Sequence, residues 1–68
     1  MDYKVWTAGP GYYFGYVEDQ KVGKQLEKEF SLVGTYFDKK GKVCGKQFKF
    51  QADYKDRFIT RIEKEKRP

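Results

Sequence analysis

The stretch Trp6-Thr7-Ala8-Gly9-Pro10-Gly11-Tyr12-Tyr13-Phe14-Gly15-Tyr16 holds five of the aromatic residues of this chain. Its Gly-Pro-Gly centre predicts a turn, and the aromatic segments on either side predict two strands of a hairpin. Tyr12, Phe14 and Tyr16 alternate along the second strand, so they lie in a row on one face. A small core has little room for three rings in a line, particularly when two carry hydroxyls that need partners. We therefore expect an exposed aromatic row that stacks on a flat partner.

Alternation of apolar and polar residues continues through most of the chain. We predict five short strands, over residues 3–8, 12–17, 29–37, 42–52 and 57–63. Asp38-Lys39-Lys40-Gly41 predicts a hairpin turn, with Gly41 available for a positive φ. The expected fold is all-β with little or no helix, a small five-stranded antiparallel barrel or curved sheet of OB-like or SH3-like type.

One segment, residues 18–28, does not follow this alternation. Val22, Gln25 and Leu26 have helical spacing, but Gly23 and the many charges weaken a helix, so we expect a loop or the end of a long hairpin. The chain is long enough for a single domain over residues 1–63, and the charged tail over residues 64–68 is expected to fray. The expected core comprises Val5, Val17, Phe30, Leu32, Cys44, Phe48, Phe50, Phe58 and Ile62.

The net charge of +5 is unevenly distributed along the 68 residues. Residues 1–34 contain four lysines and five acidic residues, which gives −1, whereas residues 35–68 contain eleven basic and five acidic residues, which gives +6. A basic half attracts polyanions such as nucleic acids. The alternative is that these lysines only keep the surface soluble.

Several classes of function are disfavoured by what the sequence lacks. With no histidine and a single cysteine, Cys44, we expect no common general base, no activated thiol and no zinc site. The spacing of Gly9, Gly11 and Gly15 does not match a phosphate-binding loop. We therefore expect a protein that is not an enzyme and uses no metal or cofactor. The lack of a disulfide framework, a signal peptide and a membrane-spanning apolar run predicts a cytoplasmic protein that does not enter membranes.

Two short segments, Lys4-Val5-Trp6 and Phe14-Gly15-Tyr16-Val17, resemble the start of a cold-shock domain. In that family, an early strand carries a tryptophan and the next an aromatic-Gly-aromatic-aliphatic motif, on a five-stranded oligonucleotide-binding barrel. The resemblance covers about the first 17 residues, and the family's second motif, which contains histidine, has no counterpart. It implies that Trp6, Phe14 and Tyr16 stack on bases of single-stranded RNA or DNA, that Gly15 is the flat spot between rings and that Val17 lies in the core.

Basic residues of the last two predicted strands are candidates for phosphate contacts. On the strand over residues 42–52, Lys46 and Lys49 lie on opposite faces, and Lys42 lies near the turn. Arg57 and Arg61 share a face of the strand over residues 57–63. The alternative is that they form the polar face that any half-buried sheet needs. The candidate nucleic-acid-binding residues are Trp6, Tyr12, Phe14, Tyr16, Lys42, Lys46, Lys49, Arg57 and Arg61.

Together these patterns favour a small non-enzymatic protein that binds single-stranded DNA or RNA by aromatic stacking and Lys/Arg–phosphate contacts. One alternative is a protein-binding module, an inhibitor or adaptor of the kind that phages and mobile elements encode, with the aromatic residues as its interface. A duplex-DNA binder and a homodimer also stay open. A shift of one residue in phase would instead place Phe14 in the core.

Overall fold

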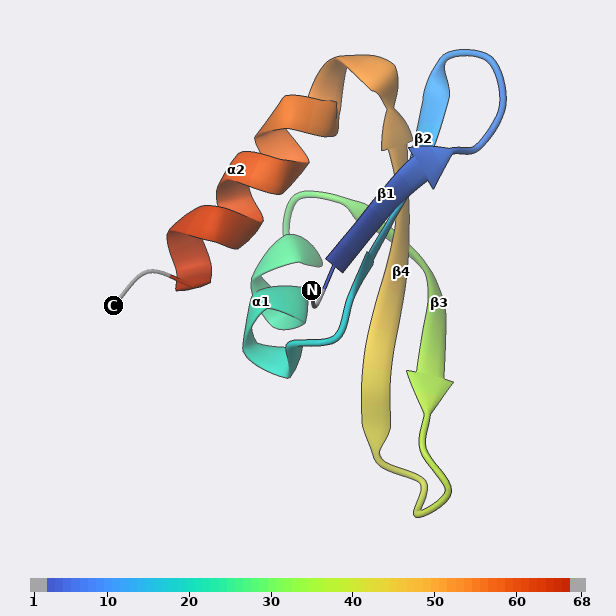
Figure 1. The fold of residues 1–68 in the computed structure, drawn as a ribbon, viewed down its shortest axis with the longest axis vertical. Coiled ribbons are helices and arrows are strands. Elements are labelled where there is room, and N and C mark those ends of the chain that lie inside the picture. The colour runs from blue at the N-terminus through green and yellow to red at the C-terminus, as the bar shows by residue number, and fades with distance from the viewer. Residues whose placement is uncertain (1–2, 67–68) are drawn as a thin grey trace.

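The protein, described here for residues 3–66 by a computed structural model, is an open antiparallel sheet with two helices. Its elements in chain order are β1 (Tyr3–Thr7), β2 (Tyr12–Val17), α1 (Gln20–Leu26), β3 (Ser31–Phe37), β4 (Val43–Gln51), the 3₁₀ turn η1 (Ala52–Tyr54) and α2 (Lys55–Lys66). The strand order is β1-β2-β4-β3, so β1 and β3 are the edge strands. Both helices lie on the same side of the sheet (Figure 1). The fold therefore has two layers, and no described helix covers the other face of the sheet.

The prediction of a five-stranded, OB-like or SH3-like barrel with little or no helix is wrong. The sheet has four strands and is open, and the predicted fifth strand over residues 57–63 lies within α2. Phe58 and Ile62 are both fully buried and four residues apart. That spacing places two residues on one face of a strand and also on one face of a helix, so it does not distinguish the two. The surrounding Lys, Arg and Glu residues favour the helix.

Residues 18–28, expected to form a loop, contain α1. The helix begins where the Asp19 carboxylate accepts hydrogen bonds from the backbone N–H groups of Lys21 at 2.9 Å and Val22 at 3.0 Å. Gly23 lowers helix propensity, but it is buried, and a Cβ there would lie 3.1 Å from Cδ of Lys46. The missing side chain lets α1 pack closely on β4, so packing rather than propensity selects the helix.

Both predicted hairpin turns are confirmed. Gly9-Pro10-Gly11 joins β1 to β2, with φ of +112° and +81° at its two glycines. In the turn between β3 and β4, the Asp38 carboxylate accepts hydrogen bonds from the backbone N–H groups of Lys40 and Lys42, and Gly41 has a φ of +82°. At the C-terminus, residues 64–66 belong to α2 instead of a frayed tail, and residues 67–68 of that predicted tail lie outside the described residues. No described helix is both long and apolar enough to cross a membrane.

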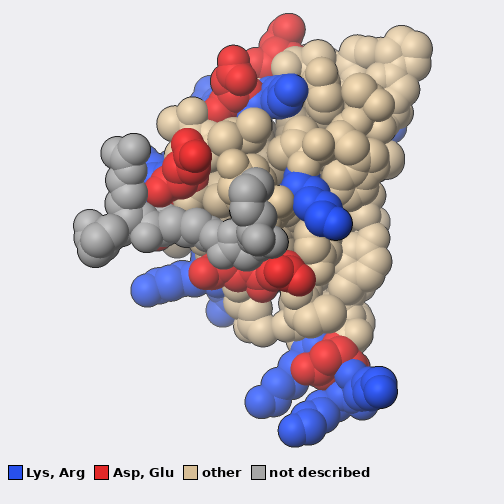
Figure 2. Space-filling model, viewed as in Figure 1, with Lys and Arg blue, Asp and Glu red and all other residues tan. Residues whose placement is uncertain are grey.

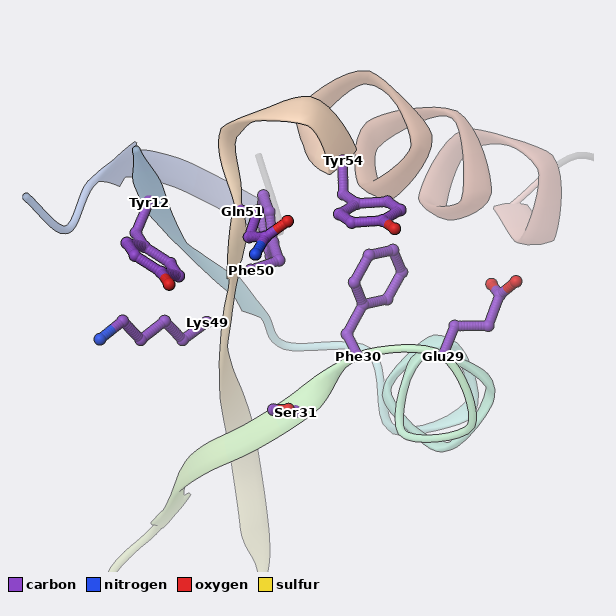
Figure 3. A pocket seen from close by; sticks show the side chains of 8 residues that line it. All are labelled: Tyr12, Glu29, Phe30, Ser31, Lys49, Phe50, Gln51 and Tyr54. Atoms are coloured by element: carbon purple, nitrogen blue, oxygen red, sulfur yellow. The ribbon is translucent and has the colours of Figure 1, made fainter. Parts of the chain in front are cut away.

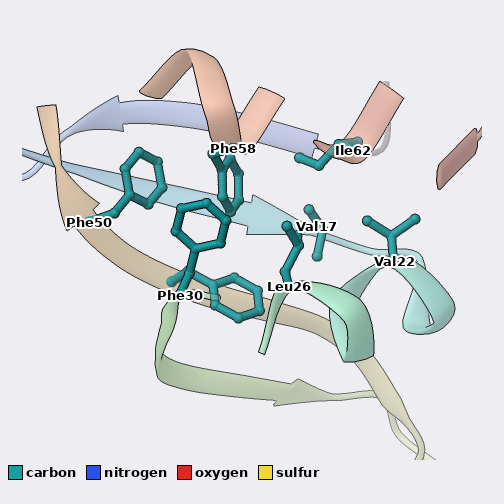
Figure 4. Close-up of a cluster of buried hydrophobic side chains, with 8 residues drawn as sticks. Val17, Val22, Leu26, Phe30, Phe50, Phe58 and Ile62 are labelled. Carbon is teal, nitrogen blue, oxygen red and sulfur yellow. The ribbon is translucent and has the colours of Figure 1, made fainter. Parts of the chain in front are cut away.

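The core lies between the helices and the sheet (Figure 4). Its buried side chains are Val17, Val22, Leu26, Phe30, Phe48, Phe50, Phe58 and Ile62. Six of these were expected, and Val22 and Leu26 are added by α1. Three expected members differ: Val5 is only partly buried, and Leu32 and Cys44 are exposed. Leu32 lies on an edge strand, and Cys44 lies at the end of β4 that extends beyond the helices (Figure 1).

Candidate binding surface

The alternation of β2 determines which side chains lie on the uncovered face of the sheet. Gly15 and Val17 point toward the helices and are buried, with Val17 only 2 % exposed. Tyr12, Phe14 and Tyr16 alternate with them and therefore lie on the other face. The sequence left open whether Phe14 points into the core or away from it. In the structure, Phe14 lies with Tyr12 and Tyr16 on the face away from the core.

Strand pairing brings further side chains to the same face as the row. Trp6 of β1 and Lys49 of β4 are both paired with Phe14, and Lys4 and Gln47 are both paired with Tyr16. Cross-strand partners share a face, so these residues form one continuous surface. We call it the open face; its side chains are Lys4, Trp6, Tyr12, Phe14, Tyr16, Ser31, Tyr36, Gln47, Lys49 and Gln51.

The rings of the open face pack against one another and stay accessible. The ring centroids of Trp6 and Phe14 are 5.7 Å apart, and those of Tyr16 and Tyr36 are 5.6 Å apart with an edge-on contact. The Lys49 ammonium lies 4.9 Å from the centroid of the Tyr12 ring, within range of a cation–π interaction. Trp6 and Tyr12 are each 41 % exposed. These contacts order the rings while leaving much of Trp6 and Tyr12 free to meet a partner.

Two glycines on opposite faces allow close approach of aromatic rings. Gly45 lies under the Tyr16 ring, and a Cβ there would collide with that ring. Gly15 faces the helices, where a Cβ would collide with the Phe58 ring. The role that the cold-shock resemblance implied for Gly15, a flat spot between outward rings, is therefore wrong, because Gly15 lies on the core side. The core position implied for Val17 is confirmed.

The environment of Tyr16 favours its neutral form. Partial burial raises the pKa of the Tyr16 phenol, and the negative charge of the nearby Glu18 raises it further. The neutral form of Tyr16 therefore persists to higher pH than that of a free tyrosine.

Of the five predicted basic residues, only Lys49 lies on the open face. Lys46 points to the helix side and forms an ion pair with Glu27, just after α1. Arg57 and Arg61 lie one turn apart on α2, where their guanidinium nitrogens are 3.3 Å and 3.7 Å from the Glu29 carboxylate. The expected track of basic residues across the sheet does not form, because its last strand is a helix on the other side.

Lys42, the remaining predicted basic residue, belongs to a separate group of charges. The turn between β3 and β4 carries Lys39, Lys40 and Lys42, and space-filling atoms show basic side chains gathered at that end of the molecule (Figure 2). These lysines lie beyond the end of the open face, so they extend it only for a ligand long enough to reach the turn.

Sequence reasoning missed Tyr36, which belongs to the open face. Simple alternation groups Tyr36 with Leu32, but a register shift between Leu32 and Gly34 places the two on opposite faces. The Tyr36 hydroxyl donates a hydrogen bond to the side-chain carbonyl of Gln47. The signal available in the sequence was Gly34, because a glycine inside a strand often marks a bulge.

A hollow of about 260 Å³ adjoins the open face at the C-terminal end of β4. Figure 3 shows side chains from β2, β4, η1 and the start of β3 around it. Its lining residues are Tyr12, Glu29, Phe30, Ser31, Lys49, Phe50, Gln51 and Tyr54. Tyr12, Ser31, Lys49 and Gln51 also belong to the open face, so the two features are continuous.

Within residues 3–66, no cluster of three or more His, Cys, Asp or Glu side chains is arranged to hold a metal ion. Comparisons with protein-family models, with curated proteins and with solved structures found no match. Function is therefore inferred from the open face and the hollow beside it.

Proposed function

We propose that the protein binds single-stranded DNA or RNA on the open face. The observation that carries the proposal is the group formed by Trp6, Tyr12, Phe14 and Tyr16, which two adjacent strands place together on the uncovered face. Aromatic side chains on an open antiparallel sheet are a common platform for unpaired bases. Each stacked base contributes about 1–3 kcal/mol. Two or three stacked bases would support useful affinity without sequence-specific contacts.

The shape of this surface favours single strands over duplexes. Bases in a duplex are already stacked on each other, and proteins reach their edges by inserting a helix or a β-ribbon into a groove. The aromatic rings here lie on the face of a sheet with Lys4 on an edge strand and Lys49 beside the Tyr12 ring, an arrangement suited to splayed bases. A cytoplasmic location is part of this proposal, and the exposed free thiol of Cys44 is consistent with a reducing compartment.

A protein partner is the second candidate, and the placement of charge favours it in one respect. Lys46, Arg57 and Arg61 are turned away from the open face and paired with carboxylates, which leaves Lys4 and Lys49 as its basic residues. Tryptophan and tyrosine are also the residues most enriched in protein interfaces. A complex with nucleic acid should then contain few ion pairs, and the salt dependence of the affinity measures their number.

The test is a titration of the single tryptophan, Trp6, followed by fluorescence. We expect saturable quenching by a short single-stranded oligonucleotide and a weaker response to a duplex of the same sequence. Affinity should fall with salt at a log–log slope of about −1.4 if Lys4 and Lys49 alone neutralise phosphates, and about −3.5 if the three turn lysines also take part. The slope therefore shows whether the strand reaches the turn.

Two phenylalanine variants separate the open face from general effects. Phe14→Ala removes a ring from the row and should weaken binding roughly fivefold or more, the loss expected for one stacked base. Phe37→Ala removes a ring that is 61 % exposed, at the far end of β3, and should leave affinity unchanged when the salt slope shows that the strand stops short of the turn lysines. No quenching by either nucleic acid at low salt would refute the proposal and favour the protein partner.

A further inference from the structure

The hollow beside the open face exists because β4 is longer than β3 at this end. The last pair between the two strands is Ser31 with Lys49, so β3 does not run alongside Phe50 and Gln51. The chain before Ser31 turns back toward α1, where the backbone N–H of Glu29 donates to the carbonyl of Leu26. The outer edge of β4 is therefore uncovered over its last two residues.

The uncovered edge presents the backbone of Gln51 to the hollow. The backbone N–H of Ala52 donates to the carbonyl of Gly11, so Ala52 and, two residues earlier, Phe50 direct their backbone groups toward β2. Gln51 lies between them and directs its N–H to the opposite side, where β3 has ended. Its carbonyl, as that of the N-cap residue of η1, accepts the first hydrogen bond of this 3₁₀ turn. A backbone N–H donor thus lies on the floor of the hollow, which Gln51 lines.

The walls of the hollow are aromatic. The Tyr12 ring stands on the open-face side of β4, and the Tyr54 ring, 44 % exposed, stands on the other side (Figure 3). Phe30, which packs edge-on against the core rings of Phe50 and Phe58, continues the wall below Tyr54. A flat apolar group entering from the open face would meet rings on both sides.

The size of the hollow, more than its charge, favours a base. The Glu29 carboxylate and the Lys49 ammonium both line it, and the Arg57 guanidinium lies 3.3 Å from Glu29, so opposite charges are balanced around the hollow. The volume of about 260 Å³ is slightly below the range of roughly 300–1,000 Å³ for pockets that hold drug-sized ligands, so a smaller flat group suits it better.

We infer that this hollow receives one nucleobase of a single strand bound on the open face, with the ring beside Tyr54 and the polar edge of the base on the Gln51 backbone. The inference rests on the proposed function and adds to it a distinct site that reads one base. A fixed backbone N–H favours a base with an acceptor on the edge that faces it, whereas stacking on the row tolerates every base.

The experiment combines removal of single bases from the oligonucleotide with removal of single rings from the protein. A short single strand with an abasic site at each position in turn is titrated against the wild type, Tyr54→Ala and Tyr36→Ala. Tyr36 is the matched control, because it is 46 % exposed, similar to Tyr54, and does not line the hollow. Loss of a base stacked on the row also weakens binding, so several positions should show a penalty of roughly fivefold or more, and at one of them the penalty comes from the hollow. That penalty should vanish in Tyr54→Ala and persist in Tyr36→Ala.

The outcomes separate this inference from the proposed function. If single strands bind and Phe14→Ala weakens them, but no position depends on Tyr54, the hollow does not hold a base and the open-face proposal stands. If the penalty vanishes equally in Tyr36→Ala, the effect is not specific to the hollow and the inference fails. If no single strand binds at all, both the proposed function and this inference are refuted.

Discussion

Replacing Gly15 with alanine tests the packing that joins the sheet to α2. A Cβ at this position would collide with Cε2 and Cζ of Phe58 and lie 2.9 Å from Cε2 of Phe50. These rings cannot move aside easily, because Phe58 is fully buried, stacks on Phe50 with centroids 4.6 Å apart and meets Phe30 at 5.2 Å. The added methyl group must therefore displace α2 or distort β2.

The size of the effect follows from two opposing terms. Overpacking of a core costs about 1–3 kcal/mol. Alanine in place of glycine also restricts the unfolded chain, which stabilises the folded state by about 0.4–1 kcal/mol. The net loss should be about 1–2 kcal/mol, which lowers the Tm of a domain of this size by roughly 4–16 °C. A chain of this length is stable by only about 3–10 kcal/mol in total, so the loss should be easy to detect.

Urea unfolding followed by Trp6 fluorescence or far-UV circular dichroism measures this loss. Gly34→Ala is the matched control, because its Cβ would lie in ordinary contact, 3.8 Å from Cβ of Gln47. We expect a lower midpoint for Gly15→Ala at an unchanged m-value, and an unchanged or higher midpoint for Gly34→Ala. Equal midpoints for Gly15→Ala and the wild type would show that the Phe58 ring does not lie against Gly15.

Two further predictions concern Tyr16 and the edge of the sheet. Because the pKa of Tyr16 is raised above its usual value of 10.0, the stabilisation by its neutral form is complete below pH 10 and is lost as the pH rises through the higher folded-state pKa. Urea midpoints measured across pH 10 should therefore fall more for the wild type than for Tyr16→Phe. An equal fall of the midpoint in both proteins would show that the pKa of Tyr16 is not raised in the folded state. The edge strand β3 contains no charged residue, and its Leu32, Val33 and Phe37 are exposed, so pairing with a second copy is expected at high concentration. Sedimentation should show self-association that Val33→Lys abolishes, and a wild-type monomer at every concentration would exclude this.

The strands were predictable because each shows its alternation over several residues and is bounded by a distinct turn. The helices were not, for two different physical reasons. In α2, the buried residues Phe58 and Ile62 satisfy the spacing of both element types, so their pattern did not distinguish a helix from a strand. In α1, Gly23 argues against a helix locally, yet its missing side chain is what lets the helix pack beside Lys46. Tertiary packing outweighed local propensity in α1, whereas in α2 the propensity of the surrounding charged residues agrees with the helix.

The aromatic residues of the candidate surface could be predicted from the sequence of β1 and β2, whereas the positions of the basic residues could not. Strand alternation and hairpin pairing are local, and they place Trp6, Phe14 and Tyr16 together. The basic residues depended on the element type of residues 57–63 and on which face of β4 each lysine occupies. The bulge near Gly34 adds a register shift that moves Tyr36 to the open face and that strict alternation cannot anticipate.

The separation of the two faces makes binding and folding independently testable. Every buried core side chain lies on the helix side or in the helices, while the row lies on the other face. Removing a ring from the row loses cross-strand contacts of about 0.2–1 kcal/mol, which is small compared with the total stability of about 3–10 kcal/mol. Phe14→Ala should therefore remain folded while it loses a stacking partner. A binding defect in that variant reports on the open face itself, and a defect in Gly15→Ala reports on the packing behind it.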